Sequence, residues 1–535
     1  MHKITVKDFP FLDFGDLRRD ERFVNIINNI SSSPGSSIPK QNKRWYDTKA
    51  TYEFFKNKEV STEALKKTMM SYGAKQVSGN TQLLVLHDIS NISYNDLQAE
   101  GLGYLDNKEG RGILAYSSMA VTTEGLPLSL LYQHTWVRPL DELGKSSKRK
   151  QVKFEDKESY RWHDGMQEVN KLLSPSMHKI HIADREADIY ELFFHAYESN
   201  TDLLIRARHN RKLVIGSSLW DNIALEPVAS TVSLDIMDKS GKKKINVEVE
   251  VKYHQVEILR PSNNKNSYES VMLTAIEIKE KCDKGKDKED CIHWKLLTTL
   301  DVNSVVDALQ CVKWYTYRWL IERFHYVLKS GTKIEELQLK DAKSLQKAIA
   351  VYSMAAFRVM QLVYQSRHSP DISCEVVITK PQWKTLYMLI HQNKSMPKKP
   401  PTLYDAVMWI GQLGGHLGRK SDGPPGLKTV WLGYQQLCHA SSVYELMTQK
   451  IWVRDSCRQA GYLIFKFPHL LINPHIRNPH IRTLLYHHLH RSSLSIVHIS
   501  YQVQSRRKIF SNFQFCIAHS CNCIPFSHYP AGKAY

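Results

Sequence analysis

The sequence predicts an α/β protein built on a mixed sheet that is flanked by helices. From about residue 80, three short apolar runs typical of strands follow one another: TQLLVLHD, RGILAYSSMAVT and PLSLLYQHTWV. A strand–helix–strand succession comes next, formed by KIHIAD, READIYELFFHAY and DLLIRARH. Strands in succession followed by strand–helix–strand units are typical of a mixed sheet with helices packed on it.

The length of the chain allows several domains. Its 535 residues, 42% of them hydrophobic and 24% charged, fit a globular protein of two or three domains. We expect four regions: a helical N-terminal domain over 1–75, a core over 76–375, a helical C-terminal region over 376–448, and a His-rich basic tail over 449–535. The tail lacks sustained periodicity. A disordered tail and a tail read from a shifted frame both remain open.

The N-terminal region reads as two helical segments. DLRRDERFVNIINNI has apolar residues at helical spacing, and SSSPGSSIP then breaks the pattern. The second segment interleaves aromatic and basic side chains; its aromatic residues are Trp45, Tyr46, Tyr52, Phe54 and Phe55. Such a pattern fits either a DNA-contacting module or a small helical domain with an aromatic core.

Residues 213 to about 290 predict an inserted antiparallel β-subdomain. INVEVEVKYHQVEIL alternates apolar and polar positions, as a strand with one solvated face does, and VMLTAIEI is its expected partner. HWKLLTTL then returns to the character of a core strand.

The charge of the chain indicates a polyanionic partner. Lys and Arg exceed Asp and Glu by 19 residues, which favours nucleic acid over an anionic membrane because no basic amphipathic helix of the membrane-binding type is evident. The longest apolar stretch is broken by Arg358 and Gln361, and the N-terminus does not resemble a signal peptide. We therefore expect a cytoplasmic protein with free cysteines and no membrane partner.

One amphipathic segment, YTYRWLIERFHYVLKSG, carries polar residues at regular intervals. If it forms one helix, Arg318, Glu322 and Lys329 lie within roughly 60° of one another, with Tyr315 at the edge of the group. A helix of this kind is usually a surface helix whose polar face meets only water. The polar residues acquire a role only if other functional residues lie near them.

Two aspartates are candidates for that role. LLVLHD and KIHIAD place Asp88 and Asp184 at the ends of predicted strands, where open sheets present functional groups. Together with Glu322 they would repel one another unless divalent cations neutralised them, and Mg²⁺ prefers such oxygen ligands. Two ions about 4 Å apart can assist phosphodiester cleavage. Each aspartate by itself is more commonly a strand-end turn or a helix cap.

The spacing Tyr315-x2-Arg318-x3-Glu322-x6-Lys329 resembles the Tyr-Arg-Glu-Lys (YREK) signature of bacterial insertion-sequence transposases. These are cut-and-paste DDE enzymes with a ribonuclease-H-like core. LHDISNISY, ADREADIYELF, HTWVRP and FEDKESYRW also resemble segments of that family, and the resemblance runs from about residue 14 to about 448. The tail has no counterpart in the family.

The resemblance implies roles for individual residues. Asp88, Asp184 and Glu322 would be catalytic and would hold two Mg²⁺ ions, for which Mn²⁺ can substitute. The residues implied in DNA binding are Tyr315, Arg318 and Lys329 on phosphates, Trp294 stacked on a flipped base, and Arg206 near the active site. For Trp294, a buried core position is the alternative.

The same resemblance implies a DNA transposase that binds terminal inverted repeats as a homodimer. It would act on double-stranded DNA, both transposon ends and target, by hydrolysis, hairpin formation and strand transfer in the bacterial nucleoid. The N-terminal domain would bind DNA and the C-terminal helices would dimerise. Two alternatives stay open: an inactivated relic that only binds DNA, and a metal-dependent nuclease with the same core fold.

Overall fold

The computed structural model describes residues 1–42, 44–143, 153–199, 201–237, 243–262, 268–281, 291–392, 395–419 and 421–466. It divides into a compact unit, Met1–Met447, and a second unit that begins at Thr448. Most of the predicted tail, from residue 467 onward, lies outside the described residues. The helix α13 (Leu427–Lys466) contains the described part of the tail.

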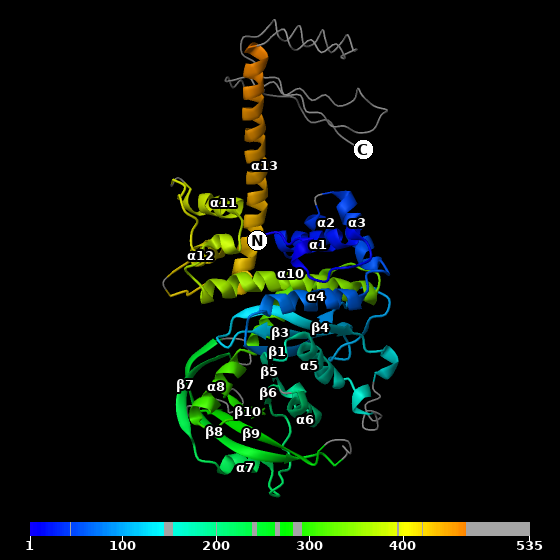
Figure 1. Ribbon diagram of the computed structural model, residues 1–535, viewed down its shortest axis with the longest axis vertical. Coiled ribbons are helices and arrows are strands. Elements are labelled where there is room, and N and C mark those ends of the chain that lie inside the picture. The colour runs from blue at the N-terminus through cyan, green and yellow to red at the C-terminus, as the bar shows by residue number, and fades with distance from the viewer. Residues whose placement is uncertain are drawn as a thin grey trace, which may run out of the picture. The chain divides into compact units, whose positions relative to one another are not determined.

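The first unit is organised around one mixed sheet (Figure 1). In the described part of the chain this sheet has ten strands in the order β2-β3-β1-β5-β6-β10-β9-β8-β7, with β4 paired to β3. The pairs β1–β5 and β5–β6 are parallel, whereas the other pairs are antiparallel. The strands are β1 (Gln82–Ser93), β2 (Gly103–Tyr104), β3 (Arg111–Val121), β4 (Pro127–Trp136), β5 (His178–Ala183), β6 (Asp202–Arg206), β7 (Ser230–Met237), β8 (Lys243–Leu259), β9 (Ser270–Glu280) and β10 (His293–Thr298).

Strand β1 is longer than the sequence predicted. The prediction ended the strand at Asp88, but the backbone of β1 stays paired with β3 as far as Ser93. The apolar run stops at Leu86 because the parallel contact with β5 stops there, while the antiparallel contact with β3 continues. Asp88 therefore lies within a strand, just beyond the parallel part of the sheet.

The strands predicted as an insertion form, but they are not a separate subdomain. Strand β9 pairs with β8 on one side and with the core strand β10 on the other, so β7, β8 and β9 extend the central sheet. Residues 273–278 of β9 are buried without a break, which is the pattern of an interior strand covered on both faces. The alternating pattern of β8 alone suggested a sheet with a solvated face.

Helices cover both faces of the sheet (Figure 1). Helix α4 packs on β4, and the long α10 packs on α4 and β4. The N-terminal helices α1 and α3 and the C-terminal helix α12 pack on α10 in turn. The helices are α1 (Leu17–Ser32), α2 (Ile38–Gln41), α3 (Trp45–Lys56), α4 (Thr62–Val77), α5 (Tyr160–Leu172), α6 (Tyr190–Ser199), α7 (Leu219–Leu225), α8 (Val305–Thr316), α9 (Trp319–Tyr326), α10 (Ala342–His368), α11 (Lys380–His391) and α12 (Leu403–Leu413). None of the described helices has the length and apolar character that a membrane span needs.

The segment from Tyr315 to Gly331 is not one regular helix. Tyr317 and Arg318 lie between α8 and α9, and their N–H groups donate to the carbonyls three residues earlier, which tightens the turn. A π-helical segment, Val327–Gly331, then widens it. A uniform rotation of 100° per residue therefore does not describe how Tyr315, Arg318, Glu322 and Lys329 are arranged.

Candidate active site

The two predicted aspartates come from neighbouring parallel strands. Leu86 of β1 lies opposite Ile182 of β5, and Asp88 and Asp184 each follow two residues later. The backbone at Asp184 is still extended, so side chains continue to alternate between the faces of the sheet. Asp88 and Asp184 therefore project from the same face, which is also the face of the buried Leu86 and Ile182.

Glu322 joins them from α9, in whose first turn it lies. Burial raises the pKa of the Glu322 carboxyl above its usual value, and the negative charges of Asp88 and Asp184 raise it further against the opposing effect of Arg318. Each of these aspartates is thus near enough to affect the charge of Glu322. The structure brings the three predicted carboxylates to one place.

Each carboxylate also has a donor or a cation beside it. An Arg318 Nη1 lies 2.5 Å from Glu322 Oε1, and the Tyr315 hydroxyl donates to Asp184 Oδ1 over 3.2 Å. Arg206, the last residue of β6, approaches Asp184 to 3.8 Å. His325 Nδ1 lies 3.2 Å from Asp88 Oδ2. The negative charges of the site are therefore partly neutralised by the protein itself.

The charge of Asp184 is favoured by these neighbours. Burial alone would raise the pKa of its carboxyl, but Arg318, the backbone N–H of Arg185, Arg206 and the Tyr315 hydroxyl together hold that pKa below its usual value. Asp184 stays ionised under conditions in which Glu322 takes up a proton more readily. The three carboxylates are electrostatically unequal.

The predicted DNA-contacting residues differ in accessibility. Arg318 and Tyr315 are buried, whereas Lys329 is partly exposed and makes no hydrogen bond or ion pair with another described residue. Trp294 in β10 is 7% exposed and packs edge-to-face on Tyr315, with 5.1 Å between ring centroids. In this structure Trp294 occupies the core position that was its alternative role, and little of the ring is open to a base.

Two residues beside the carboxylates were missed from the sequence. His325 is buried against Asp88, and its Nε2 has no hydrogen-bond partner among the described residues. Burial, followed by the charges of Asp88, Asp106 and Asp184, raises the pKa of the Glu186 carboxyl. The spacing of three residues between Glu322 and His325 was the available signal for the histidine.

A buried aspartate supports the segment that follows Asp184. The predicted helix READIYELFFHAY begins only at Tyr190, because Arg185–Ala187 form a 3-10 turn and Asp188 points inward. Asp188 accepts hydrogen bonds from the backbone N–H groups of Arg208 and His209 and pairs with Arg211 at 2.5 Å. This contact fixes the loop that directly follows Arg206.

A pair of buried histidines braces the strands from the opposite face. His87 Nε2 lies 2.8 Å from His181 Nδ1, and His181 Nε2 lies 3.0 Å from the side-chain oxygen of Asn170 in α5. His87 Nδ1 accepts from the hydroxyls of Tyr116 and Ser118. One proton on each Nε2 satisfies this whole chain of bonds, so both rings are held neutral between β1 and β5.

The oxygen donors of the site suit a hard divalent cation, but they are not arranged as a ready-made metal site. No group of three or more His, Cys, Asp or Glu side chains in the described ranges stands at metal-binding distances. The partial burial of Asp88, Asp184 and Glu322, and their mutual repulsion, match what a cation would relieve. The arginine beside Glu322 would have to give up that contact.

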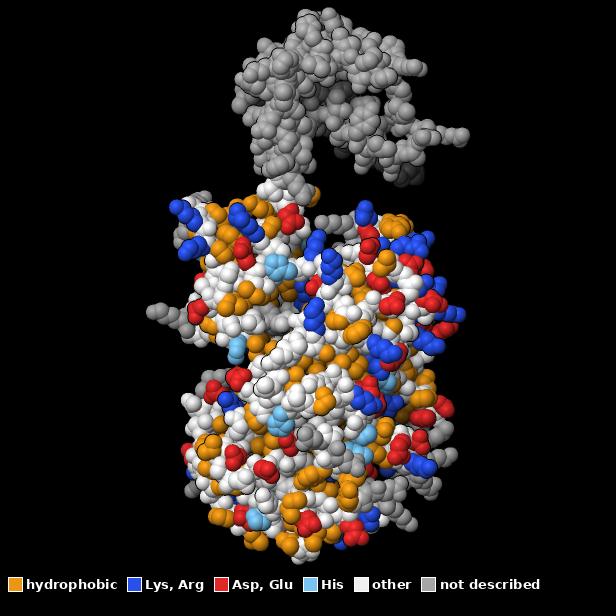
Figure 2. Space-filling view, viewed as in Figure 1, with side chains coloured by type: hydrophobic (Ala, Val, Ile, Leu, Met, Phe, Trp, Pro, Cys, Tyr) orange, Lys and Arg blue, Asp and Glu red, His pale blue; other side chains and the backbone are white. Residues whose placement is uncertain are grey.

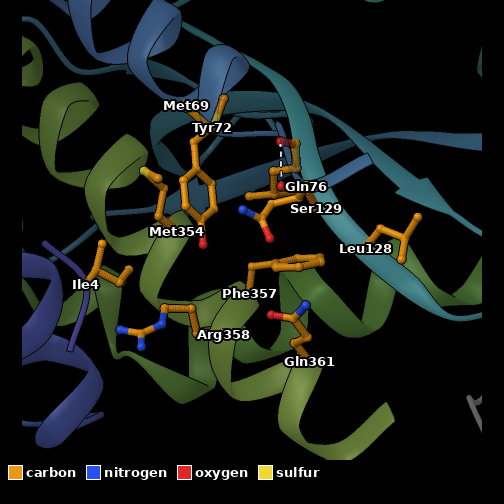
Figure 3. Close-up of a pocket in the computed structure, with 11 residues that line it drawn as sticks. Ile4, Met69, Tyr72, Gln76, Leu128, Ser129, Met354, Phe357, Arg358 and Gln361 are labelled. Carbon is orange, nitrogen blue, oxygen red and sulfur yellow. Dashed lines mark hydrogen bonds between the residues drawn. The ribbon is translucent and has the colours of Figure 1, made fainter. Parts of the chain in front are cut away.

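The best-defined cavity of the described chain lies elsewhere. It is enclosed by the N-terminal segment, α4, β4 and α10, and it contains none of the predicted site residues (Figure 3). Its lining is mainly apolar, with Arg358 and Gln361 at one side (Figure 3).

Comparison with protein families identifies two segments of a transposase. Residues 2–60 match the model for transposase DNA-binding. Residues 354–445 match the model for the Tn5 transposase dimerisation domain. Together the two matches support a Tn5-type transposase that binds DNA and forms dimers. The narrower YREK group stays a prediction.

Among solved structures, the chain is similar to a piggyBac transposase synaptic complex with hairpin DNA, determined by cryo-EM. The sequence identity is 9% and the TM-score is 0.31, over 57% of this chain and 50% of that chain. The match thus spans about half of that protein's length, and at this TM-score it carries no argument about fold or function.

Proposed function

We propose that the chain is a cut-and-paste DNA transposase in which Asp88, Asp184 and Glu322 form the centre for cleaving and joining phosphodiester bonds. The strand register carries this proposal, because the pairing of Leu86 with Ile182 sets two carboxylates on one face of the sheet. The raised pKa of Glu322 adds the third carboxylate to the same place. We further propose a ribonuclease-H-like core and membership of the YREK group, supported by the mixed sheet and by the four signature residues around it.

Asp88, Asp184 and Glu322 would hold Mg²⁺, with Mn²⁺ as a substitute. Two bound ions would activate a water or hydroxyl group and stabilise the leaving oxygen. Tyr315 keeps Asp184 oriented through its hydroxyl, and His325 does the same for Asp88. Arg318 and Lys329 supply positive charge for DNA phosphates, as the resemblance implies.

The proposed reaction consists of exchanges at phosphorus. Water first replaces the 3′-oxygen at the transposon end, which leaves a free 3′-hydroxyl and a 5′-phosphate. That hydroxyl attacks the opposite strand and displaces its 3′-oxygen, giving a hairpin that water then opens. The freed 3′-hydroxyl finally displaces a 3′-oxygen in target DNA. Every step forms one P–O bond and breaks another, so a single centre serves them all.

Charge-removing substitutions of the carboxylates test the centre. Asp88→Asn, Asp184→Asn and Glu322→Gln keep nearly the same size, and we expect each to abolish nicking of a duplex that carries the element's end while DNA affinity persists. Asp96→Asn is the matched control, because Asp96 is an exposed carboxylate only eight residues after Asp88. Nicking at the wild-type rate in any of the three variants would contradict the assignment.

A pre-cut duplex end distinguishes a transposase from a nuclease. A transposase incubated with a pre-cut end and supercoiled target plasmid gives joined product, whereas a nuclease of the same fold gives none. Two chains per pair of ends are expected in the complex, since residues 354–445 match a dimerisation domain. Cleavage without any joined product would favour the nuclease.

A further inference from the structure

Two large aromatic side chains stand in solvent at the start of α3. Trp45 is 78% exposed and Tyr46 is 71% exposed, whereas Phe54 and Phe55 near the end of the same helix are buried in the core. The structure thus divides the aromatic residues of this helix, which the sequence left between DNA contact and core. Trp45 and Tyr46 contribute little to the packing of the domain.

Basic side chains surround this pair. The Arg22 guanidinium lies 5.8 Å from the centroid of the Tyr46 ring. Asp47 accepts from Arg22 over 3.0 Å and from Arg44 over 3.1 Å, so one carboxylate fixes two guanidinium groups beside the aromatic pair. These interactions hold the pKa of Asp47 below its usual value, the bond from Arg22 contributing most.

Further positive charges lie next to the same rings. Arg18, one helical turn before Arg22 in α1, is 89% exposed and interacts electrostatically with Tyr46. Lys49 is exposed four residues after Trp45, so it lies on the same face of α3. Figure 2 shows Lys and Arg gathered over this helical part of the molecule, with hydrophobic side chains among them.

We infer that Arg18, Arg44, Trp45, Tyr46 and Lys49 form an aromatic–basic surface that binds the DNA duplex at the transposon end. The inference rests on the proposed function and names the residues that would dock the DNA. Arginine and lysine would neutralise backbone phosphates, and the two rings would pack on sugars or bases. A second copy of this chain fits less well, because a symmetric contact would bring these arginines against one another.

Salt-dependent binding tests the surface. The probe is a fluorescein-labelled duplex from the end of the element, titrated by anisotropy at several salt concentrations. Trp45→Ala and Tyr46→Ala should each weaken binding about tenfold without changing the salt slope, as loss of a stacking contact does. Arg44→Gln and Lys49→Gln should each lower the slope by about one counterion.

Phe11→Ala is the matched control, since Phe11 is 76% exposed in the same region but lies outside the surface, and its binding should be unchanged. Thermal melting of each variant checks that the exposed substitutions leave the fold intact. Wild-type affinity in both aromatic variants would overturn the inference, as would weaker dimerisation with unchanged DNA binding. That failure is distinct from failure of the proposed function, which is judged by nicking in the Asp88, Asp184 and Glu322 variants.

Discussion

The carboxylate site and the aromatic–basic surface hold their charged groups in opposite ways. At the site, Glu322 is paired with Arg318 at 2.5 Å and Asp184 with Tyr315 and Arg206, all in partly or largely buried positions. At the surface, Arg18 and Trp45 stand in solvent. The site must exchange its internal partners before it can act, whereas the surface is available to a ligand as it stands.

This difference separates two kinds of effect. Substitutions at the site, or in the scaffold behind it, should alter chemistry, cation binding and stability. Substitutions at the surface should alter DNA affinity and its salt dependence alone. Variants in which these effects mix would show that the two regions are coupled.

Removing Asp188 should have the largest effect on stability. Asp188 is buried and pairs with Arg211 while accepting two backbone N–H groups, so Asp188→Ala leaves a buried guanidinium uncompensated. We expect the free energy of unfolding, measured with urea, to fall by about 3–5 kcal/mol. The double variant Asp188→Leu with Arg211→Met should recover part of the loss. A decrease below about 1 kcal/mol in the single variant would show that the loop after Arg206 is held by other contacts.

Parts of this site follow from the sequence and parts do not. The period of two along a strand sets Asp88 on the face of Leu86, which the apolar run alone reveals. The register that pairs Leu86 with Ile182 depends on a contact between segments nearly a hundred residues apart, so no local pattern encodes it. The shortened turn at Tyr317 was missed because no proline or glycine marks it.

The histidine pair should make the scaffold sensitive to acid. Burial, with a contribution from His181, lowers the pKa of His87 well below its usual value, and burial lowers the pKa of His181 to about 3. The unfolded chain takes up these protons below about pH 6.5, and the folded chain does not. The stability contributed by neutral His87 and His181 is therefore present above pH 6.5 and is lost as pH falls toward their folded-state pKa values.

Each of these histidines contributes at most about 1.4 kcal/mol per pH unit to that slope. His181→Gln should flatten the dependence of the unfolding free energy on pH between about 6.5 and 4 by one such contribution. His439→Gln, at an exposed position, should leave the slope unchanged. An unchanged slope in His181→Gln would show that the buried pair takes up protons without unfolding. DNA binding through the surface arginines should not follow this titration, because arginine stays charged.

Arg318 should compete with a cation for Glu322. Its guanidinium stands on Glu322 Oε1, so Arg318→Gln frees an oxygen and removes a neutralising charge. We expect Mn²⁺ to bind the DNA-free variant about tenfold more tightly, from the electrostatic effect of one neighbouring charge, as measured by the electron paramagnetic resonance signal of free Mn²⁺. Arg318→Lys, which keeps the charge, is the control. Weaker Mn²⁺ binding in Arg318→Gln would mean that the pair instead orients Glu322 for its ligand.

The smallest expected effect belongs to Lys329. This side chain is partly exposed and unpaired among the described residues, so Lys329→Ala should leave stability unchanged and lower the salt slope of DNA binding by about one counterion. Lys340→Ala, at an exposed position eleven residues later, is the control. Combining Lys329→Ala with Lys49→Gln should lower the slope by about two, because distant phosphate contacts on one duplex add. A combined change of only one would mean that the site and the surface do not hold the same DNA at the same time.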